Sequence, residues 1–312
     1  MKVVKVSKEN FFVRLKKDFQ KNWIVYLMLL PVITYFLIFC YGPMYGILMG
    51  FKDYRIKQGI LGSEWNNFEY FKRFFSSYQL PLLLKNTLGI SLYSLLVEIP
   101  MPIIFALFLN YLKHPRLKKT VQMVSYAPHF ISTVVICSMI VLFTTPDTGV
   151  FNILREMMGL ESVNFLAKPQ WFKSIYVWSG VWQNMGWSAI IYVSALAGVD
   201  YEMHEAAIID GASKIQRMLY IDLPSIKSTI VMLLILKLGG IMNVGFEKVY
   251  LLQNNLNTSA SSIISTYVYK VGLIDANYGY STAVGLFNNL VNVILLLLAN
   301  GICKKVADES LL

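Results

Sequence analysis

The sequence predicts an all-α, polytopic membrane protein with six transmembrane helices. Of its 312 residues, 56% are hydrophobic and only 15% are charged, whereas soluble domains are about a quarter charged. The mean hydropathy is +0.53, and the apolar residues form long blocks rather than short amphipathic periods. These observations exclude a disordered chain. The cysteines Cys40, Cys137 and Cys303 lie in apolar blocks, without the spacing of a disulfide framework or a metal site.

Six apolar stretches are long enough to cross a bilayer, which takes about 20 residues per helix. They are Trp23–Met49, Leu82–Leu112, Val121–Phe143, Ser174–Ala197, Ile226–Phe246 and Ala283–Cys303. The first stretch is too long for the apolar region of a signal peptide, and no small-residue cleavage site follows it. We therefore expect one membrane domain over residues 23–305.

The distribution of Lys and Arg predicts the orientation of these spans, because cytoplasmic loops are enriched in both residues. The two termini and the loops after the second and fourth spans carry more of them than the opposite side does. Both termini, including the tail of residues 306–312, are therefore expected in the cytoplasm. The net charge of +10 is typical of loops held against an anionic lipid bilayer, and no nucleic-acid partner is expected.

The segment before the first span, residues 1–22, is basic and amphipathic. Phe11, Phe12, Leu15 and Phe19 recur at helical spacing, with Lys and Arg between them. A helix of this kind would lie flat at the cytoplasmic face of the membrane. A poorly ordered basic tail is the alternative.

The cytoplasmic loop at residues 200–224 carries strong local signals. Asp200 can cap a short helix over Tyr201–Ile209, because its carboxylate can accept from free N–H groups of the first turn. Gly211 suits the positive φ of a helix-ending turn. Pro224 suits the first turn of the fifth span, and a second short helix is expected before it.

Three motifs follow one another in this loop. They are Glu205-Ala206-Ala207, Asp210-Gly211-Ala212 and Ile221-Asp222-Leu223-Pro224. In this order, after the fourth span, they resemble the EAA loop of permease subunits from binding-protein-dependent ABC importers. Residues 126–132, 182–192 and 278–287 are similar to the polysaccharide- and oligosaccharide-type sugar permeases of that family. The resemblance covers most of residues 10–305.

This resemblance implies a type I permease fold in a bacterial cell membrane. It implies that the chain forms half of the path for an oligosaccharide or polysaccharide fragment. The implied partners are an extracellular solute-binding protein, a second permease that is a different, homologous chain, and a dimer of ATPase subunits. The EAA loop would be a cytoplasmic coupling helix that docks on the ATPase through Glu205, Ala206, Ala207, Asp210, Gly211, Leu223 and Pro224.

The sequence has no G-x-x-x-x-G-K-[ST] phosphate-binding loop. ATP and Mg²⁺ would therefore bind the partner ATPase, and this chain is expected to hold no cofactor and to be no enzyme. No metal site is expected either, because His114, His129 and His204 are isolated in the sequence.

Ionisable residues inside spans are costly and often functional. Glu98 in the second span and Lys237 in the fifth are expected to face the translocation cavity, where they would pair or bind sugar hydroxyls. The alternative is a packing contact for Glu98 and snorkelling for Lys237. The other candidates for the sugar path combine aromatic faces with amides or a carboxylate: Trp182, Gln183, Asn184, Trp187, Tyr192, Asn243, Glu247, Asn288, Asn289 and Asn292. For each of these, helix packing is the competing interpretation.

Two other functions stay open from the sequence. An ATP-independent secondary transporter could use Glu98 as a proton site, but it would have no use for an EAA loop. A permease of the same family could carry amino acids or phosphate, although the sugar-type regions argue against it. The long outer loops, at about residues 50–82, 144–173 and 247–282, are expected to form short helices that receive the binding protein.

Overall fold

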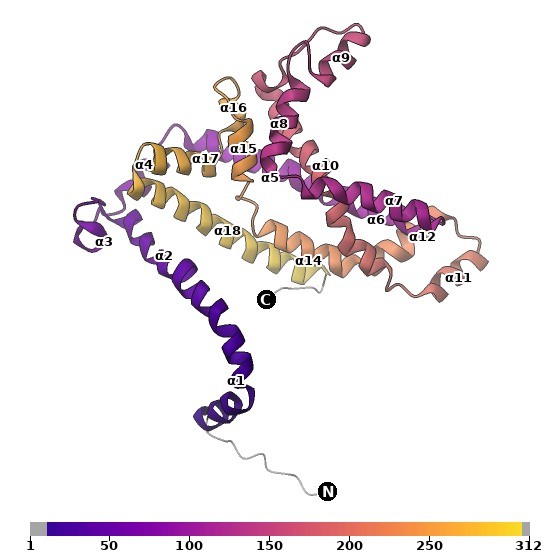
Figure 1. Ribbon diagram of the computed structural model, residues 1–312, viewed down its shortest axis with the longest axis horizontal. Helices are drawn as coiled ribbons and strands as arrows, with labels where there is room; N and C mark the ends of the chain where they lie inside the picture. The colour runs from indigo at the N-terminus through magenta and orange to yellow at the C-terminus, as the bar shows by residue number, and fades with distance from the viewer. Residues whose placement is uncertain (1–10, 308–312) are drawn as a thin grey trace, which may run out of the picture.

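The computed structural model describes residues 11–307 and confirms an all-α protein (Figure 1). The helices are α1 (Phe11–Tyr35), α2 (Gly42–Met44), α3 (Gly59–Gly62), α4 (Glu69–Phe75), α5 (Leu80–Glu98), α6 (Pro100–Asn110), α7 (Pro115–Tyr126), α8 (Thr133–Thr144), α9 (Val150–Met157), α10 (Pro169–Leu196), α11 (Tyr201–Ile209), α12 (Lys214–Arg217), α13 (Leu223–Ser225), α14 (Lys227–Leu238), α15 (Phe246–Leu252), α16 (Thr258–Ser261), α17 (Ile264–Tyr269) and α18 (Tyr278–Ala307). Within residues 11–307, extended backbone pairs only in an isolated bridge between Lys52 and Trp65.

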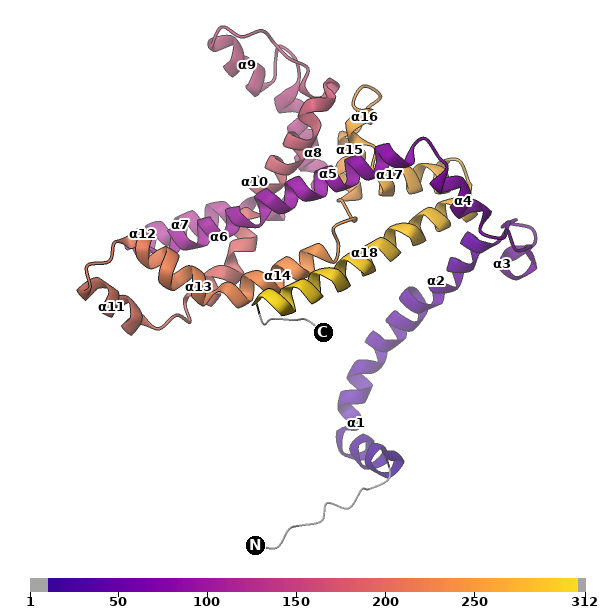
Figure 2. The ribbon, with the colours of Figure 1, turned by 180° about the vertical axis from the view of Figure 1, so that it is seen from behind.

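The first apolar helix stands apart from the rest of the bundle. α1 bends at Asn22, where φ is −118° and ψ is 22°, and a continuous helix then reaches Phe51 through a π-helical and a 3₁₀ segment. Its most apolar window is 0% buried, and both views show it projecting away from the other helices (Figures 1 and 2). Residues 1–10 and the side chains of residues 11–16 lie outside the description, so the interfacial helix stays a prediction.

Several helices are long and apolar enough to cross a membrane. Three qualify individually: Lys17–Phe51, Leu80–Asn110 and Tyr278–Gly301. Two bent helix pairs raise the number to as many as five. α10, which contains the predicted fourth span, is 28 residues long but falls outside this set. The described residues thus form a multi-helix membrane protein, and the count of six stays a prediction.

The predicted third span is sharply bent. The helical segments Pro115–Phe130 and Thr133–Thr144 meet at 98°. Pro128 lacks a backbone donor, Ile131 has extended backbone, and Ser132 begins a new helix by accepting from the Val135 N–H. The span predicted over Val121–Phe143 is therefore divided between two helical segments and is not one continuous helix.

The predicted fifth span is shorter than expected and is followed by non-helical chain. α14 ends at Leu238, and α15 begins only at Phe246. Gly239, Gly240 and Gly245 lie in the break, where glycine weakens a helix by roughly 1 kcal/mol per residue relative to alanine. Non-helical backbone at membrane depth is tolerated where it is buried in protein or lines a cavity, and this segment does line one.

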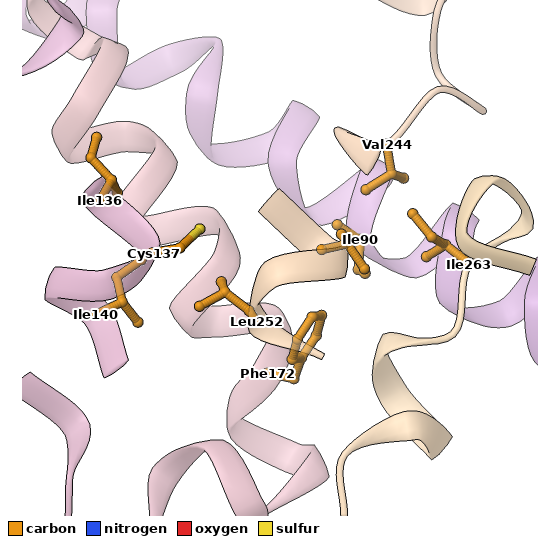
Figure 3. Close-up of a cluster of buried hydrophobic side chains, with 9 residues drawn as sticks. Ile90, Ile136, Cys137, Ile140, Phe172, Val244, Leu252 and Ile263 are labelled. Atoms are coloured by element: carbon orange, nitrogen blue, oxygen red, sulfur yellow. The ribbon is translucent and has the colours of Figure 1, made fainter. Parts of the chain in front are cut away.

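α10 forms the centre of the bundle and packs against α5, α6 and α7. Gly186 permits the closest of these approaches, because a Cβ there would lie 2.2 Å from the Ser125 carbonyl oxygen. A second cluster joins α5, α8, α10 and α15 through side chains that include Ile90, Cys137 and Phe172 (Figure 3). These contacts hold α10 beside the polar residues of α5 and α14.

Candidate translocation site and coupling loop

The two predicted intramembrane charges meet in the structure. Glu98 is the last residue of α5, and Lys237 lies in the last turn of α14. The Lys237 Nζ is 2.7 Å from the Glu98 Oε2, and the two side chains are 40% and 25% exposed. An ion pair with this much exposure stabilises the fold weakly. Its position beside the cavities therefore indicates more about function than its strength does about stability.

Two polar cavities adjoin this pair and share both of its side chains. One has a volume of about 160 Å³ and includes Ser91, Tyr176 and Asn243 in its lining. The other has a volume of about 300 Å³ and is lined by His129, Asn184, Trp187 and Ser188 among others. The predicted candidates Asn184 and Asn243 therefore line different cavities, each of which includes both members of the charge pair. A polar solute could reach hydrogen-bonding groups in both cavities.

The larger cavity has a rigid aromatic wall. The rings of His129 and Trp187 stack with centroids 4.4 Å apart and an interplanar angle of 5°. The His129 Nδ1 lies 2.9 Å from the Asn184 Oδ1. His129 was not among the predicted path residues, because Asn184 and Trp187 lie 55 or more residues away in the sequence. Its place in the bent third span became visible only in the structure.

Lys248 is a second residue that sequence reasoning missed. It lies in α15, is 8% exposed, and its Nζ donates to the Tyr176 carbonyl oxygen at 2.9 Å. A Cβ at Gly180 would lie 3.0 Å from the Glu98 Oε1 and 3.5 Å from the Lys248 Nζ. The cluster thus holds two ammonium groups, on Lys237 and Lys248, near one carboxylate. The sequence had suggested an outer loop for Lys248, because α15 is too short to be recognised from its apolar pattern.

Asparagines hold the non-helical segment after α14 against α18. The Asn243 Oδ1 accepts from the Nδ2 atoms of Asn288, at 3.0 Å, and Asn292, at 3.1 Å. The Asn292 Oδ1 also accepts from the Met242 N–H at 2.9 Å. Asn288 and Asn292 are buried, which supports the competing interpretation of polar contacts between helices for these two.

The remaining path candidates lie away from the two polar cavities. Trp182 lines a separate, apolar cavity of about 700 Å³ between α8, α9 and α10. Gln183 donates to the Ile131 carbonyl oxygen at 3.1 Å, where the third span bends. Tyr192 is 4% exposed within the apolar cluster of α6 and α10, and Glu247 is exposed at the start of α15.

The coupling loop has the predicted local structure. Asp200 caps α11, because its Oδ1 accepts from the Glu202 N–H at 3.0 Å. Gly211 has a φ of +82°, a conformation that costs a residue with a Cβ roughly 1–2 kcal/mol. Beyond it, Ser213 and Gln216 form a capping box that starts α12. The predicted cap, turn and second helix are confirmed.

The surface of this loop is apolar and uncovered within the chain. Ile209 is 85% exposed, and Ile215 and Tyr220 are exposed to a similar degree. Glu205 and Ala206 are exposed as well, beside a half-buried Ala207. Contiguous exposed apolar surface marks sites of contact with another protein or a membrane, and the small alanine side chains let a partner approach the backbone.

The loops at about residues 50–82, 144–173 and 247–282 also form short helices, as predicted. These are α3 and α4, then α9, and then α15 to α17. In α4, the Tyr70 hydroxyl donates to the Asp53 Oδ1 at 3.2 Å. Burial, followed by the Asp53 carboxylate, raises the pKa of Tyr70. This contact joins α4 to the segment that follows the first apolar helix.

The described residues form a bundle of apolar helices with polar cavities and an exposed loop, the arrangement expected of a membrane permease subunit. Comparison with known proteins supplies the family. The model of the family described as "Binding-protein-dependent transport system inner membrane component" matches residues 99–308. The chain belongs to this family and is a permease subunit of an ABC transport system in the cell membrane.

Relatives match over nearly the whole chain. The protein LplB of Bacillus subtilis (strain 168) is 46% identical over 95% of this chain and 92% of its own. The polygalacturonan/rhamnogalacturonan transport system permease protein YteP of the same strain is 45% identical over 92% and 89%. A chain in the crystal structure of a bacterial alginate ABC transporter, in complex with alginate pentasaccharide-bound periplasmic protein, superposes with a TM-score of 0.88. It is 40% identical, with 96% of this chain and 100% of that chain covered.

Proposed function

We propose that this chain forms half of the path by which an extracellular binding protein delivers an oligosaccharide to the cytoplasm. The observation that carries the proposal is the pair of polar cavities that share Glu98 and Lys237 in their linings. Permeases for polygalacturonan or rhamnogalacturonan and for arabinooligosaccharides are among the relatives. The alginate transporter structure, with its pentasaccharide-bound periplasmic protein, supports an oligosaccharide over a smaller solute.

In this proposal, sugar hydroxyls bind the polar groups of the two cavities in turn. Asn184 and Asn243 offer amide donors and acceptors, and the exposed Trp187 ring offers a flat apolar face for a pyranose ring. Glu98 and Lys237 separate the cavities, so a passing sugar would exchange hydrogen bonds with a pair that is already partly hydrated. The excess of lysine over carboxylate, with Lys248 close by, favours a sugar that carries carboxylate groups.

Transport would be driven by a dimer of separate ATPase subunits that holds the coupling loop. α11 would dock on the ATPase through Glu205, Ala206, Ala207, Asp210 and Gly211, with its exposed apolar side chains covered in the complex. Its movement would pass through Leu223 and Pro224 to α14, because α13 directly precedes that helix. Lys237 lies in the last turn of α14, so a shift of this helix would change the contact with Glu98.

The proposed topology has six spans over residues 23–305 with both termini in the cytoplasm. The bent helix pairs would form the third and fifth spans, and α10 the fourth. α10 carries polar side chains because it lies between other helices. The exposed α1 would contact lipid and a second, homologous permease, while residues 1–22 and 306–312 would lie on the cytoplasmic side.

The test is reconstitution of this chain with its partner permease, ATPase and binding protein in proteoliposomes. We expect uptake of labelled uronate-containing oligosaccharides only when ATP and the binding protein are both present. Neutral oligosaccharides of the same length and free amino acids serve as competitors. Uptake without ATP would contradict the importer assignment, and competition by amino acids alone would contradict the sugar assignment.

A further inference from the structure

A buried carboxylate lies at the base of the coupling loop. Asp222 is 0% exposed and occupies the end of the π-helical segment Met218–Asp222. This segment leads into α13, and α14 follows after a bend of 61°. Burying a charge is costly unless a partner stabilises it, and π-helical turns are frequent at functional sites.

His204 and Tyr111 lie beside this carboxylate, and Arg217 lies over the Tyr111 ring. The His204 Nε2, on α11, lies 3.2 Å from the Asp222 Oδ1, and the His204 side chain is only 12% exposed. The Tyr111 hydroxyl, at the end of α6, lies beside the same carboxylate. The Arg217 guanidinium, on α12, lies 5.6 Å from the centre of the Tyr111 ring. Figure 2 shows α11, α12 and the end of α6 at the same end of the molecule.

The polar atoms of this cluster are incompletely paired. Apart from the 3.2 Å contact between His204 and Asp222, both Asp222 oxygens, the Tyr111 hydroxyl and the Arg217 Nε are buried without a hydrogen bond of good geometry to any described residue. Buried polar groups are nearly always hydrogen-bonded, and the exceptions are often functional. The Asp222 carboxylate can therefore accept further hydrogen bonds, and the Tyr111 hydroxyl and Arg217 Nε can donate them, after a small shift of α11 or α12.

We infer that Asp222 is a positioning residue, which ties the coupling helix α11 to the end of α6 and to the start of α14. Through His204, a movement of α11 displaces the carboxylate. That displacement reaches α6 through Tyr111 and α14 through the backbone of Asp222. The far end of α6 adjoins Glu98, the last residue of α5, and α14 carries Lys237 in its last turn. Both Glu98 and Lys237 border the cavities. The inference rests on the proposed coupling of the loop to an ATPase.

The matched variants are Asp222→Asn and His204→Gln, each of which keeps the approximate side-chain volume. The complete importer is reconstituted with each, and three quantities are measured: ATPase subunit retained on purification, ATP hydrolysis without binding protein, and sugar uptake per ATP hydrolysed. We expect full retention, basal hydrolysis within about twofold, and uptake per ATP reduced about tenfold or more, as for loss of an allosteric coupling. The double variant should lose little more than either single variant, since both remove one interaction.

The control is Asp275→Asn, which removes an exposed carboxylate far from the loop in sequence, and it should match the unmodified chain. Normal uptake per ATP in both test variants would overturn the inference, and so would loss of the ATPase subunit from both, which would mean a role in assembly alone. Additive losses in the double variant would overturn it too. If the unmodified importer shows no ATP-dependent uptake, the proposed function itself fails. That result differs from failure of the inference, in which the unmodified importer transports normally.

Discussion

The coupling loop and the Glu98–Lys237 pair distribute charge and apolar surface in opposite ways. In the loop, Ile209 is 85% exposed while the Asp222 carboxylate is fully buried. Beside the pair, Ile90 is fully buried while the charged atoms border open cavities. The loop therefore exposes the apolar surface that the proposed ATPase contact would cover, whereas the pair lies where water and a polar solute can reach it.

The largest effect is expected for Gly211→Val. The φ of +82° places Val in a conformation that costs a β-branched residue roughly 1–3 kcal/mol, so the loop must change shape. We expect uptake to fall about 10- to 100-fold, given about 1.4 kcal/mol per tenfold, with normal insertion in the membrane. Uptake is measured in proteoliposomes and the amount of subunit by immunoblot.

A matched control is Gly159→Val. Gly159 also has a positive φ, +74°, and open space around its Cβ position, but it follows α9 and lies outside the loop of residues 200–224. The backbone penalty is similar, so a smaller loss of uptake isolates the role of the coupling loop. Equal losses in the two variants would contradict a special role for Gly211.

A smaller effect is expected at the charge pair. Lys237→Met leaves the Glu98 carboxylate without its partner, and Glu98→Gln does the reverse. Since both side chains are partly exposed, we expect each single variant to reduce uptake about tenfold rather than to unfold the protein. The double variant should transport as well as the better single variant, as measured by initial uptake rates. Independent, additive losses would mean that the two residues act separately.

The asparagine contacts should affect stability more than transport. Asn292→Ala removes two hydrogen bonds, to Met242 and Asn243, whereas Asn288→Ala removes one. We expect Asn292→Ala to cost roughly 1–3 kcal/mol, and Asn288→Ala to cost less. Thermal unfolding of the detergent-solubilised protein gives the order of the two Tm values. The reverse order would show that the hydrogen bonds to Asn292 are not what holds the non-helical segment.

The smallest effect is expected for Tyr192→Phe. Tyr192 is buried in an apolar cluster and lines neither polar cavity, so removing its hydroxyl should change uptake by less than about twofold, the range of substitutions away from a site. Trp182→Phe, in the separate apolar cavity, should behave alike. A tenfold rise in the sugar concentration for half-maximal uptake would place the path through this cluster instead.

The same two regions differ in how much of them the sequence predicts. The loop is local: Asp200 caps the helix that begins at the next residue, and Gly211 lies in the turn that follows this helix. Propensities and motifs therefore describe it well. The charge pair joins residues 139 positions apart. Sequence alone identified both as costly in a membrane, but it could not fix the helix phase that brings them together.

The bent and broken helices were the least predictable part of the fold. Pro128 was visible in the third span, but helices tolerate proline when neighbours satisfy the freed backbone, so the 98° bend at Ile131 and Ser132 depends on packing. The glycines after Leu238 indicated a break in the helix, but the apolar pattern continues through them and predicted one long span. His129 and Lys248 were missed for the same reason, since their roles come from these two breaks.

The most direct test of the account is contact between the coupling loop and a nucleotide-hydrolysing subunit. A single cysteine replaces Ala206 in a chain whose native cysteines are changed to serine, and a thiol-to-amine cross-linker is applied to the purified importer with and without ATP. We predict a cross-link to the ATPase subunit in at least one nucleotide state, and none from a cysteine at Gly159. A loop cysteine that reaches no ATPase subunit in any nucleotide state would contradict the account.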